Sequence, residues 1–341
     1  MIGFGSVGQG FAKLLLSKRD WLLRVKGLDV EVLGIATKSH GSLLSTKALD
    51  LDHVLKHLKD HNTLVGYGPE STDLTPTKMI NACDADLMVE LTTLAIDSGQ
   101  PAIDHIKAAF DMGMDVITAN KGPIAYAYKD LRNSARSRGV HLRFEGTVMD
   151  GTPVFSLVEK TLQGCTITGL EGILNSTSNF VLTEMSEGKT MQQAIKKAQA
   201  RGFAEADPSL DIDGWDAAAK IAALANVIMD ADSTPKDVER EGIREVSRDD
   251  VKRATSEGRR IKMIASASPT ADKIRLSVRP ELIGPESPYW SVEGTSSALT
   301  IKTDLMGNIT IVESDPQVTQ TAYAVFSDML LIVESIRSGT L

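Results

Sequence analysis

Segment 202–220, which reads GFAEADPSLDIDGWDAAAK, gathers several carboxylates and one lysine in a short stretch of chain. Asp216 and Lys220 are four residues apart, so on a helix they share one face. The next residues, 221–225, are all apolar, and a charged pair at the start of a buried helix needs a partner or a purpose. Such a pair suits an acid–base step, while the plain alternative is an i,i+4 ion pair on a capped helix. The other carboxylates of the segment are Glu205, Asp207, Asp211 and Asp213.

The chain opens with the pattern G-x-G-x-x-G, formed by Gly3, Phe4, Gly5, Ser6, Val7 and Gly8. Apolar residues at helical spacing follow at once. Glycines in such a turn let a pyrophosphate approach the backbone at the N-terminus of a helix. The pattern therefore predicts a dinucleotide site. Only two residues precede it, so either the native chain starts upstream or the first strand is very short.

Residues 35–40 read IATKSH, at the end of the expected second strand. An NAD site usually carries a carboxylate here for the ribose hydroxyls, whereas an NADP site carries a basic residue. Because no carboxylate is present and Lys38 is available for a 2′-phosphate, we expect NADP, with NAD as the alternative cofactor. The competing interpretation makes Lys38 an ordinary surface lysine.

Short β-branched runs alternate with helical patterns through the first 145 or so residues, which is typical of βαβ units and a parallel sheet. Strands are expected at 29–36, 87–91, 115–119 and 141–145, and helices at 7–23, 50–58, 102–111 and 125–138. The fold class is therefore α/β, with a dinucleotide-binding domain of the Rossmann type.

From about residue 146 the chain becomes rich in glycine and threonine, followed by an expected helix at 213–229 and strands at 273–278 and 298–303. An amphipathic run at 319–336 should pack back on the first domain. We therefore expect a dinucleotide-binding domain at 1–145 and 318–341, and an α+β substrate-binding and dimerisation domain at 146–317.

Composition excludes several classes of protein. The chain has 341 residues, 42% of them hydrophobic, and a formal net charge of -8, an ordinary balance for a globular protein that lacks the basic surface of a nucleic-acid binder. Its longest apolar run is too short for a membrane span, and no signal peptide is visible, so we expect a cytoplasmic protein. Two distant cysteines indicate neither a disulfide framework nor a thiolate zinc site.

Two further patterns favour structure over chemistry. His53, His57 and His61 recur every four residues, as zinc ligands sometimes do, but no fourth ligand is evident and a solvated helix is expected. The charge-rich run 236–250 is interpreted as a solvated helical face.

The chain resembles homoserine dehydrogenase. The resemblance rests on the motifs GFGSVG at 3–8, VELTT at 89–93, TANKGP at 118–123, EGTVMDGTP at 145–153, GILNSTSNF at 172–180 and the segment 202–220. It implies the nicotinamide-dependent interconversion of L-aspartate 4-semialdehyde and L-homoserine in threonine and methionine biosynthesis, carried out by a homodimer.

The resemblance also implies roles for single residues. Lys220 matches the proton donor and acceptor of the family, and Lys121 matches a second lysine near nicotinamide and substrate. The residues that match substrate contacts are Glu205, Asp216, Asp211 and Thr177. The residues that match cofactor contacts outside the glycine-rich turn are Thr92, Thr93 and Gly202.

A monovalent cation loop is implied at 145–152, where the backbone carbonyls of Glu145, Val148, Asp150 and Thr152 would bind an ion such as Na⁺. This chain has Met149 and Asp150 where the family usually has glycines, and Ser176 and Phe203 replace a glycine and a tyrosine.

Two alternatives stay open. One is another NADP-dependent dehydrogenase that acts on a small amino acid or aldehyde. The other is a Rossmann-type nucleotide sensor without activity. The joint presence of Lys121, Lys220, Glu205 and Asp216 argues against the sensor, which needs none of them.

Overall fold

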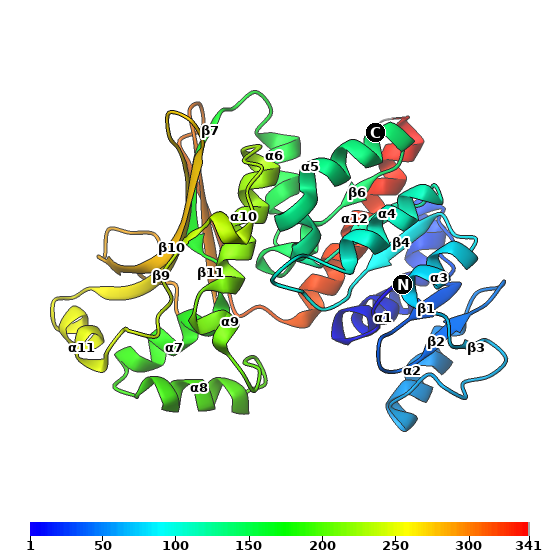
Figure 1. Ribbon diagram of the computed structural model, residues 1–341, viewed down its shortest axis with the longest axis horizontal. Coiled ribbons are helices and arrows are strands. Elements are labelled where there is room, and N and C mark those ends of the chain that lie inside the picture. Colours follow the sequence, from blue (N-terminus) through cyan, green and yellow to red (C-terminus); the bar gives the residue numbers. More distant parts are fainter. Residues whose placement is uncertain (340–341) are drawn as a thin grey trace. The chain divides into compact units, whose positions relative to one another are not determined.

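The computed structural model describes residues 1–339. The chain forms two compact units, one made of Met1–Pro153 with the chain from Gln317 on, and the other of Val154–Pro316 (Figure 1). Residues 146–153 lie in the first unit, not the second, because the two short turns at 145–151 pack on the last helix of the chain. The α/β class predicted from the sequence is confirmed.

The first unit contains a parallel sheet of the order β4-β5-β6, with β4 at Leu87–Glu90, β5 at Asp115–Thr118 and β6 at Leu142–Arg143. The apolar side chains of β4 and β5 are mostly buried, as expected for strands covered on both faces. A second, antiparallel sheet has the order β1-β2-β3, with β1 at Gly34–Ala36, β2 at Ser42–Leu44 and β3 at Ser71–Thr72. Ile2 connects the two sheets, because it bridges in parallel to both Ala36 and Glu90.

Helices of the first unit follow the strands in the expected alternation. They are α1 (Ser6–Trp21), α2 (Leu51–His61), α3 (Pro76–Ala82), α4 (Ala102–Asp111), α5 (Lys121–Arg138) and α12 (Val318–Ser338). The last of these packs along α1, with Phe326 and Met329 in one hydrophobic core with Phe11 and Leu15 (Figure 1). Among the described residues, no helix is both long enough and apolar enough to cross a membrane.

The second unit is built on a six-stranded sheet of the order β12-β11-β7-β9-β10-β8. Its strands are β7 (Ile167–Ile173), β8 (Glu239–Arg240), β9 (Arg260–Pro269), β10 (Ile274–Ile283), β11 (Ser297–Thr303) and β12 (Asn308–Glu313). Its helices are α6 (Val154–Thr161), α7 (Ser176–Ser186), α8 (Met191–Ala200), α9 (Ser209–Ile212), α10 (Trp215–Ile228) and α11 (Arg248–Ser256). Helix α10 packs against β7, β9 and β10 and carries the lysine discussed below.

Four expectations about single elements were wrong. The strand expected at 141–145 is formed only at Leu142–Arg143, before a 3₁₀ turn begins at Glu145. The strand expected at 29–36 is formed only at Gly34–Ala36, the residues that pair with β2. Helix α5 begins at Lys121, four residues early, since the side chain of Asn120 caps it. The run 236–250 is no helical face: it forms a short turn, strand β8 and only the start of α11.

Candidate functional site

The glycine-rich turn has the geometry that a dinucleotide needs. Helix α1 begins at Ser6 with Gly5 as its N-cap, and no side chain caps its first N–H groups. A Cβ atom added at Gly3 would lie 2.5 Å from the carbonyl oxygen of Leu91, and one added at Gly8 would lie 3.0 Å from that of Gly3, so both positions exclude side chains. Around Gly5 the space is open. An uncapped helix N-terminus beside open space fits the pyrophosphate of a nicotinamide dinucleotide.

The end of β4 is organised by a fully buried carboxylate that the sequence analysis did not single out. Glu90 Oε1 accepts hydrogen bonds from the backbone N–H and the hydroxyl of Thr92, and Oε2 accepts one from Thr118 Oγ1 at 3.1 Å. His105 Nδ1 lies 3.7 Å from Oε1. The sequence did contain a signal for this role of Glu90: an acidic residue ends an apolar strand within the motif VELTT. Thr92 is half-buried and Thr93 is exposed.

Asn120 extends this arrangement to the second of the two lysines. Its side-chain nitrogen donates to the carbonyl oxygen of Thr92 at 3.1 Å, and its Oδ1 accepts from the N–H of Gly122 at 2.9 Å. Lys121 is the first residue of α5 and is half-buried. The position of Lys121 is thus fixed through Asn120 and Thr92 by the ends of β4 and β5.

Lys38 is exposed in the bend between β1 and β2. The hydroxyl of Thr37 donates to the carbonyl oxygen of Gly41 at 2.7 Å and accepts from the N–H of His40 at 2.8 Å. Thr37 therefore holds the turn, and Lys38 and Ser39 are the exposed polar side chains at its tip.

In the second unit, a cluster of polar side chains surrounds Lys220. Its Nζ atom lies 2.9 Å from Asp216 Oδ2 and donates to the carbonyl oxygen of Leu174 at 2.8 Å. The side-chain nitrogen of Asn175 donates to Asp216 Oδ2 at 2.9 Å and to Asp211 Oδ1 at 2.6 Å. Asn175 thus links the two carboxylates, and Asp216 links Asn175 to Lys220.

Local sequence explains why these side chains converge. Asn175 is the N-cap of α7 and accepts the N–H of Ser178 at 2.7 Å, which fixes its amide. Gly214 takes a positive φ of 79° immediately before α10, so Asp216 stands in the first helical turn, where the helix dipole favours an anion. The sequence analysis quoted Asn175 within GILNSTSNF but assigned it no role. An asparagine at the start of a helix is a readable N-cap signal, but its contact with Asp216 depends on the fold.

The two carboxylates of this cluster are not equivalent. Burial raises the pKa of Asp211, and the neighbouring charge of Asp216 raises it further, while the hydrogen bond from Asn175 opposes both effects. The side chains of Asp216 and Lys220 are 14% and 15% exposed, so the pair is largely withdrawn from water. This explains how a charged pair can begin a helix whose next residues are buried.

The other carboxylates of the segment do not join the cluster. Glu205 is exposed, and only its backbone carbonyl is held, by Gln199. Asp207 accepts hydrogen bonds from Ser209 at the start of α9, and Asp213 pairs with Arg244 at 2.8 Å. The sequence could not separate the five acids, because their directions depend on the turns around α9.

Two further predicted site residues border this region. Thr177 is buried, and its hydroxyl donates to the carbonyl oxygen of Phe203 at 3.3 Å. Gly202 is exposed and takes a positive φ of 80° at the end of α8, a conformation that suits glycine.

The loop 145–152 consists of two successive 3₁₀ turns, Glu145–Thr147 and Met149–Gly151, both packed on α12. Met149 and Asp150 have positive φ values of 48° and 47°, which is the conformation that glycine would adopt freely. The N–H of Glu145 donates to Asp328 at 2.9 Å. Val148 is buried and Thr152 is half-buried, and the carbonyl oxygen of Val148 accepts a hydrogen bond from the N–H of Gly151 at 3.3 Å. Within residues 1–339, no group of three acidic, histidine or cysteine side chains could hold a metal ion.

The sequence matches the family model described as homoserine dehydrogenase over residues 153–330. It also matches the model described as homoserine dehydrogenase, NAD binding domain, over residues 3–145. The NAD(+)-dependent homoserine dehydrogenase of Pseudomonas canavaninivorans is 35% identical, and the match covers 98% of this chain and 96% of that protein. The homoserine dehydrogenase of Methanocaldococcus jannaschii is 35% identical, with 99% of this chain and 98% of that protein covered.

Solved structures agree with these sequence matches. The putative homoserine dehydrogenase from Archaeoglobus fulgidus superimposes with a TM-score of 0.86 at 30% identity and 97% coverage of both chains. A hyperthermophilic archaeal homoserine dehydrogenase in complex with NADPH gives a TM-score of 0.84 at 30% identity, with 98% of this chain and 96% of that chain covered. The chain therefore belongs to the homoserine dehydrogenase family, NAD(P)-dependent oxidoreductases that interconvert L-aspartate 4-semialdehyde and L-homoserine in threonine and methionine biosynthesis.

Proposed function

We propose that Lys220 carries the proton in this reaction. The observation behind the proposal is the cluster in which Lys220 Nζ contacts Asp216 and the carbonyl of Leu174, largely withdrawn from water. When homoserine is oxidised, the neutral amine of Lys220 takes the proton of the hydroxyl group. When the aldehyde is reduced, its ammonium returns a proton to the developing alkoxide, the usual role of a positioned general acid.

The ammonium group of the substrate needs an anionic site, and Asp216 and Asp211 supply two carboxylates within reach of a single amide. We assign substrate binding to these two residues, with Thr177 beside them and Glu205 as a further carboxylate. Asn175 is a positioning residue that holds both aspartates.

When bound, the nicotinamide ring supplies or accepts the hydride. The residues proposed to hold the dinucleotide are Gly3, Phe4, Gly5, Ser6, Val7 and Gly8 for the pyrophosphate, together with Thr92, Thr93, Lys121 and Gly202. Lys121 is in addition the second catalytic lysine of the proposal. Its support is the network from Glu90 through Asn120, which gives the start of α5 a defined position.

For the adenosine ribose, the exposed Lys38 supports a preference for NADP over NAD. The turn held by Thr37 leaves no carboxylate at its tip to repel a 2′-phosphate. The domain roles follow: the first unit binds the dinucleotide and the second binds the substrate.

A cation and a partner subunit complete the proposal. The carbonyls of Glu145, Val148, Asp150 and Thr152 are proposed to bind a monovalent cation such as Na⁺, since hard cations prefer oxygen ligands. Homodimer formation through the second unit is supported by the edge strand β12, where Val312 is 50% exposed, and by the adjoining turn, where Leu305 and Met306 are exposed. A cytoplasmic location stays a prediction.

Single lysine variants test the proposal. Lys220→Ala and Lys121→Ala should each lower kcat for homoserine oxidation by at least about two orders of magnitude. Lys197→Ala is the matched control, because Lys197 also pairs with a carboxylate in the second unit, at 2.7 Å from Glu184, and has no proposed role. Turnover in folded Lys220→Ala and Lys121→Ala protein that equals the control would refute the lysine mechanism.

A further inference from the structure

Glu90, the last residue of β4, is 0% exposed and is surrounded by hydrogen-bond donors. Its carboxylate accepts the N–H and the hydroxyl of Thr92 and the hydroxyl of Thr118. Both hydroxyl oxygens accept in turn from Asn120, whose N–H donates to Thr118 at 3.0 Å and whose side-chain nitrogen donates to Thr92 at 3.4 Å. Each hydroxyl therefore directs its single hydrogen at Glu90. This set of donors fits an ionised carboxylate, which only accepts hydrogen bonds.

An ionised carboxylate without contact to water needs a positive charge nearby. His105, on α4, is buried, and its Nδ1 atom lies 3.7 Å from Glu90 Oε1. Among the described residues, this Nδ1 atom has no hydrogen-bond partner. The distance is too long for a hydrogen bond but short enough for two opposite charges to attract each other strongly in a dry site. An imidazolium at this position would have Glu90 as its counter-charge.

The Glu90 carboxylate lies between two parts of the proposed dinucleotide site. On one side is Leu91, whose carbonyl oxygen is so close to Gly3 that a Cβ atom added there would be 2.5 Å away. On the other side, the hydroxyl groups that bind Glu90 also hold Asn120, the N-cap of α5, and Lys121 is the first residue of that helix. The position of this carboxylate therefore affects both the glycine-rich turn and Lys121.

We propose that His105 is a positioning residue for the dehydrogenase reaction. As an imidazolium it is the counter-ion of Glu90, and through Glu90 it holds the glycine-rich turn and the start of α5 in place. It makes no contact of its own with substrate or cofactor. The inference rests on the proposed functions of the glycine-rich turn and of Lys121, and it adds to them the requirement for a buried pair of opposite charges.

Loss of the imidazolium leaves Glu90 with two unfavourable states. As an ion, it is a buried charge without a partner. As a neutral acid, it carries a proton on one of the oxygens that now accept hydrogen bonds, so a donor from Thr92 or Thr118 has to turn away. In both states the hydroxyl groups that hold Asn120 shift, and Lys121 shifts with them.

A double-mutant cycle between His105 and Glu90 tests the proposal. His105→Leu removes the cation, Glu90→Gln removes the anion at nearly constant size, and a third variant carries both changes. We expect His105→Leu alone to lower kcat for homoserine oxidation by at least about tenfold and to raise KM for NADP. In the Glu90→Gln background, the same change should lower kcat by about twofold or less, because no buried charge is left to balance.

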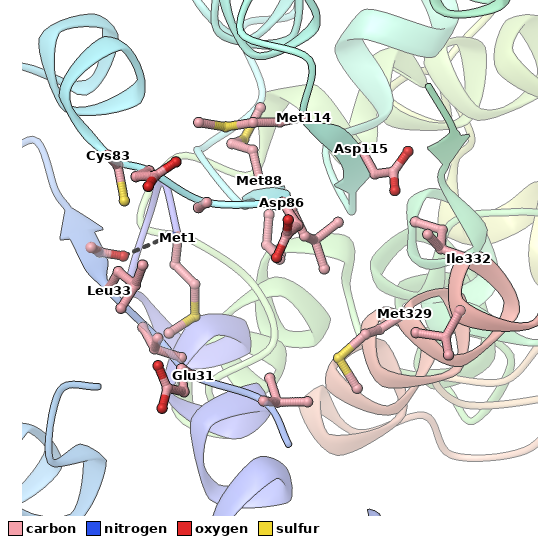
Figure 2. Close-up of a pocket in the computed structure, with 18 of the residues that line it drawn as sticks. Met1, Glu31, Leu33, Cys83, Asp86, Met88, Met114, Asp115, Met329 and Ile332 are labelled. Carbon is pink, nitrogen blue, oxygen red and sulfur yellow. Dashed lines mark hydrogen bonds between the residues drawn. The ribbon is translucent and has the colours of Figure 1, made fainter. Parts of the chain in front are cut away.

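His141→Leu is the matched control. His141 also pairs with a carboxylate of the first unit, since its Nδ1 atom lies 2.9 Å from Asp115, but Asp115 begins β5 whereas Thr118 ends it. At that opposite end of the strand, Asp115 lies at the wall of a cavity of about 820 Å³ that Met88 and Met114 also line (Figure 2). His141→Leu should lower Tm but change neither kcat nor KM for NADP. This control separates a general loss of stability from a loss of positioning.

Equal effects of His105→Leu in the parent and in the Glu90→Gln background would overturn the proposal, because His105 would then act by packing alone. Parent values of kcat and of KM for NADP in folded His105→Leu would also contradict it. If His105→Leu does not fold, the double variant should fold and turn over like Glu90→Gln. A double variant that fails to fold as well would refute the role of charge.

Failure of the lysine mechanism would give a different result. Lys121→Ala would then turn over like the control Lys197→Ala. The effect of His105→Leu on KM for NADP would remain, because it passes through the glycine-rich turn.

Discussion

The Nζ atom of Lys220 lies 2.9 Å from Oδ2 of Asp216, one turn earlier on α10. The spacing of the two residues would allow an ordinary ion pair on a helix surface, which contributes little to stability. This pair differs from a surface ion pair, because Asn175 donates to the same Oδ2 atom and both charged side chains are largely buried. Asn175 holds Asp216 in place and also contacts the second carboxylate, Asp211. Two carboxylates positioned in this way are suited to binding a cationic substrate.

Asp216→Asn removes the charge and keeps the size of the side chain. We expect KM for homoserine to rise by about tenfold or more, because a charge-assisted hydrogen bond to the substrate ammonium contributes roughly 1.5–3 kcal/mol. Affinity for NADP should stay the same. Glu205→Gln should act in the same direction. Asp213→Asn is the control, since Asp213 pairs with Arg244 instead. A KM equal to the parent value in Asp216→Asn would show that the Asp216–Lys220 ion pair has a structural role and that Asp216 does not bind the substrate.

Asp211→Asn should stabilise the protein and impair it as an enzyme. Burial and the charge of Asp216 raise the pKa of Asp211, so the ionised form is disfavoured in the folded state. Below the ordinary pKa the carboxyl is protonated in both states, and stability falls as the pH rises through the raised folded value. At neutral pH the variant should therefore have a higher free energy of unfolding than the parent.

Urea unfolding and homoserine kinetics measure both effects of Asp211→Asn. Asp207→Asn is the contrasting control, since hydrogen bonds from Ser209 lower the pKa of Asp207 and its loss should destabilise the start of α9. Reduced stability of Asp211→Asn at pH 7 would contradict this account of the cluster.

Lys38→Ala should weaken NADP by roughly tenfold to a hundredfold and leave NAD nearly unchanged. The reason is that Lys38 stands exposed at the tip of the turn held by Thr37, where a 2′-phosphate is expected. Values of kcat/KM for both cofactors in parent and variant provide the measurement. The adjacent Ser39→Ala tests whether the effect belongs to the turn as a whole. Equal losses for NAD and NADP in Lys38→Ala would exclude Lys38 as the phosphate reader.

The stability of the second unit should depend on pH through Lys262. This lysine is 2% exposed and donates to Asn179 Oδ1 at 2.9 Å and to the carbonyl of Val292. Burial lowers its pKa from 10.5 to about 8. Between these values the unfolded chain holds the proton and the folded chain has released it, so stability rises with pH across that window.

Urea unfolding at pH 7, 8.5 and 9.5 tests this dependence. The free energy of unfolding of the parent should rise by about 1–3 kcal/mol relative to Lys262→Met, which has no proton to release. Parallel pH profiles for the two proteins would show that Lys262 does not titrate as described.

Elements with strong periodicity were readable from the sequence. The helix expected at 102–111 coincides with α4, and the apolar runs that became β4 and β5 were placed to within one residue. The expected strand at 29–36 is formed only at Gly34–Ala36, because a strand depends on its neighbours and these are the residues that pair with β2 and, through Ala36, with Ile2.

For the candidate site, the sequence identified the segment but not the geometry. In the sequence, Asp211 and Asp216 cannot be told apart from Asp207 and Asp213. Their side chains point in different directions only because of the turns around α9. Asn175, some forty residues earlier in the chain, reaches the cluster only because it caps α7 at the end of β7. Glu90 likewise looked like one acid among many, and its role at the end of β4 follows from its burial.

Chemical rescue of Lys220→Ala tests the central claim, that the Lys220 amine moves the proton, most directly. The rate of NADP reduction by homoserine is measured in this variant with and without ethylamine at increasing concentration. We predict a rate at least about a hundredfold below that of the parent without amine, and a partial recovery that grows with amine concentration and with the basicity of the amine. A folded variant that turns over at the parent rate without added amine would contradict the account.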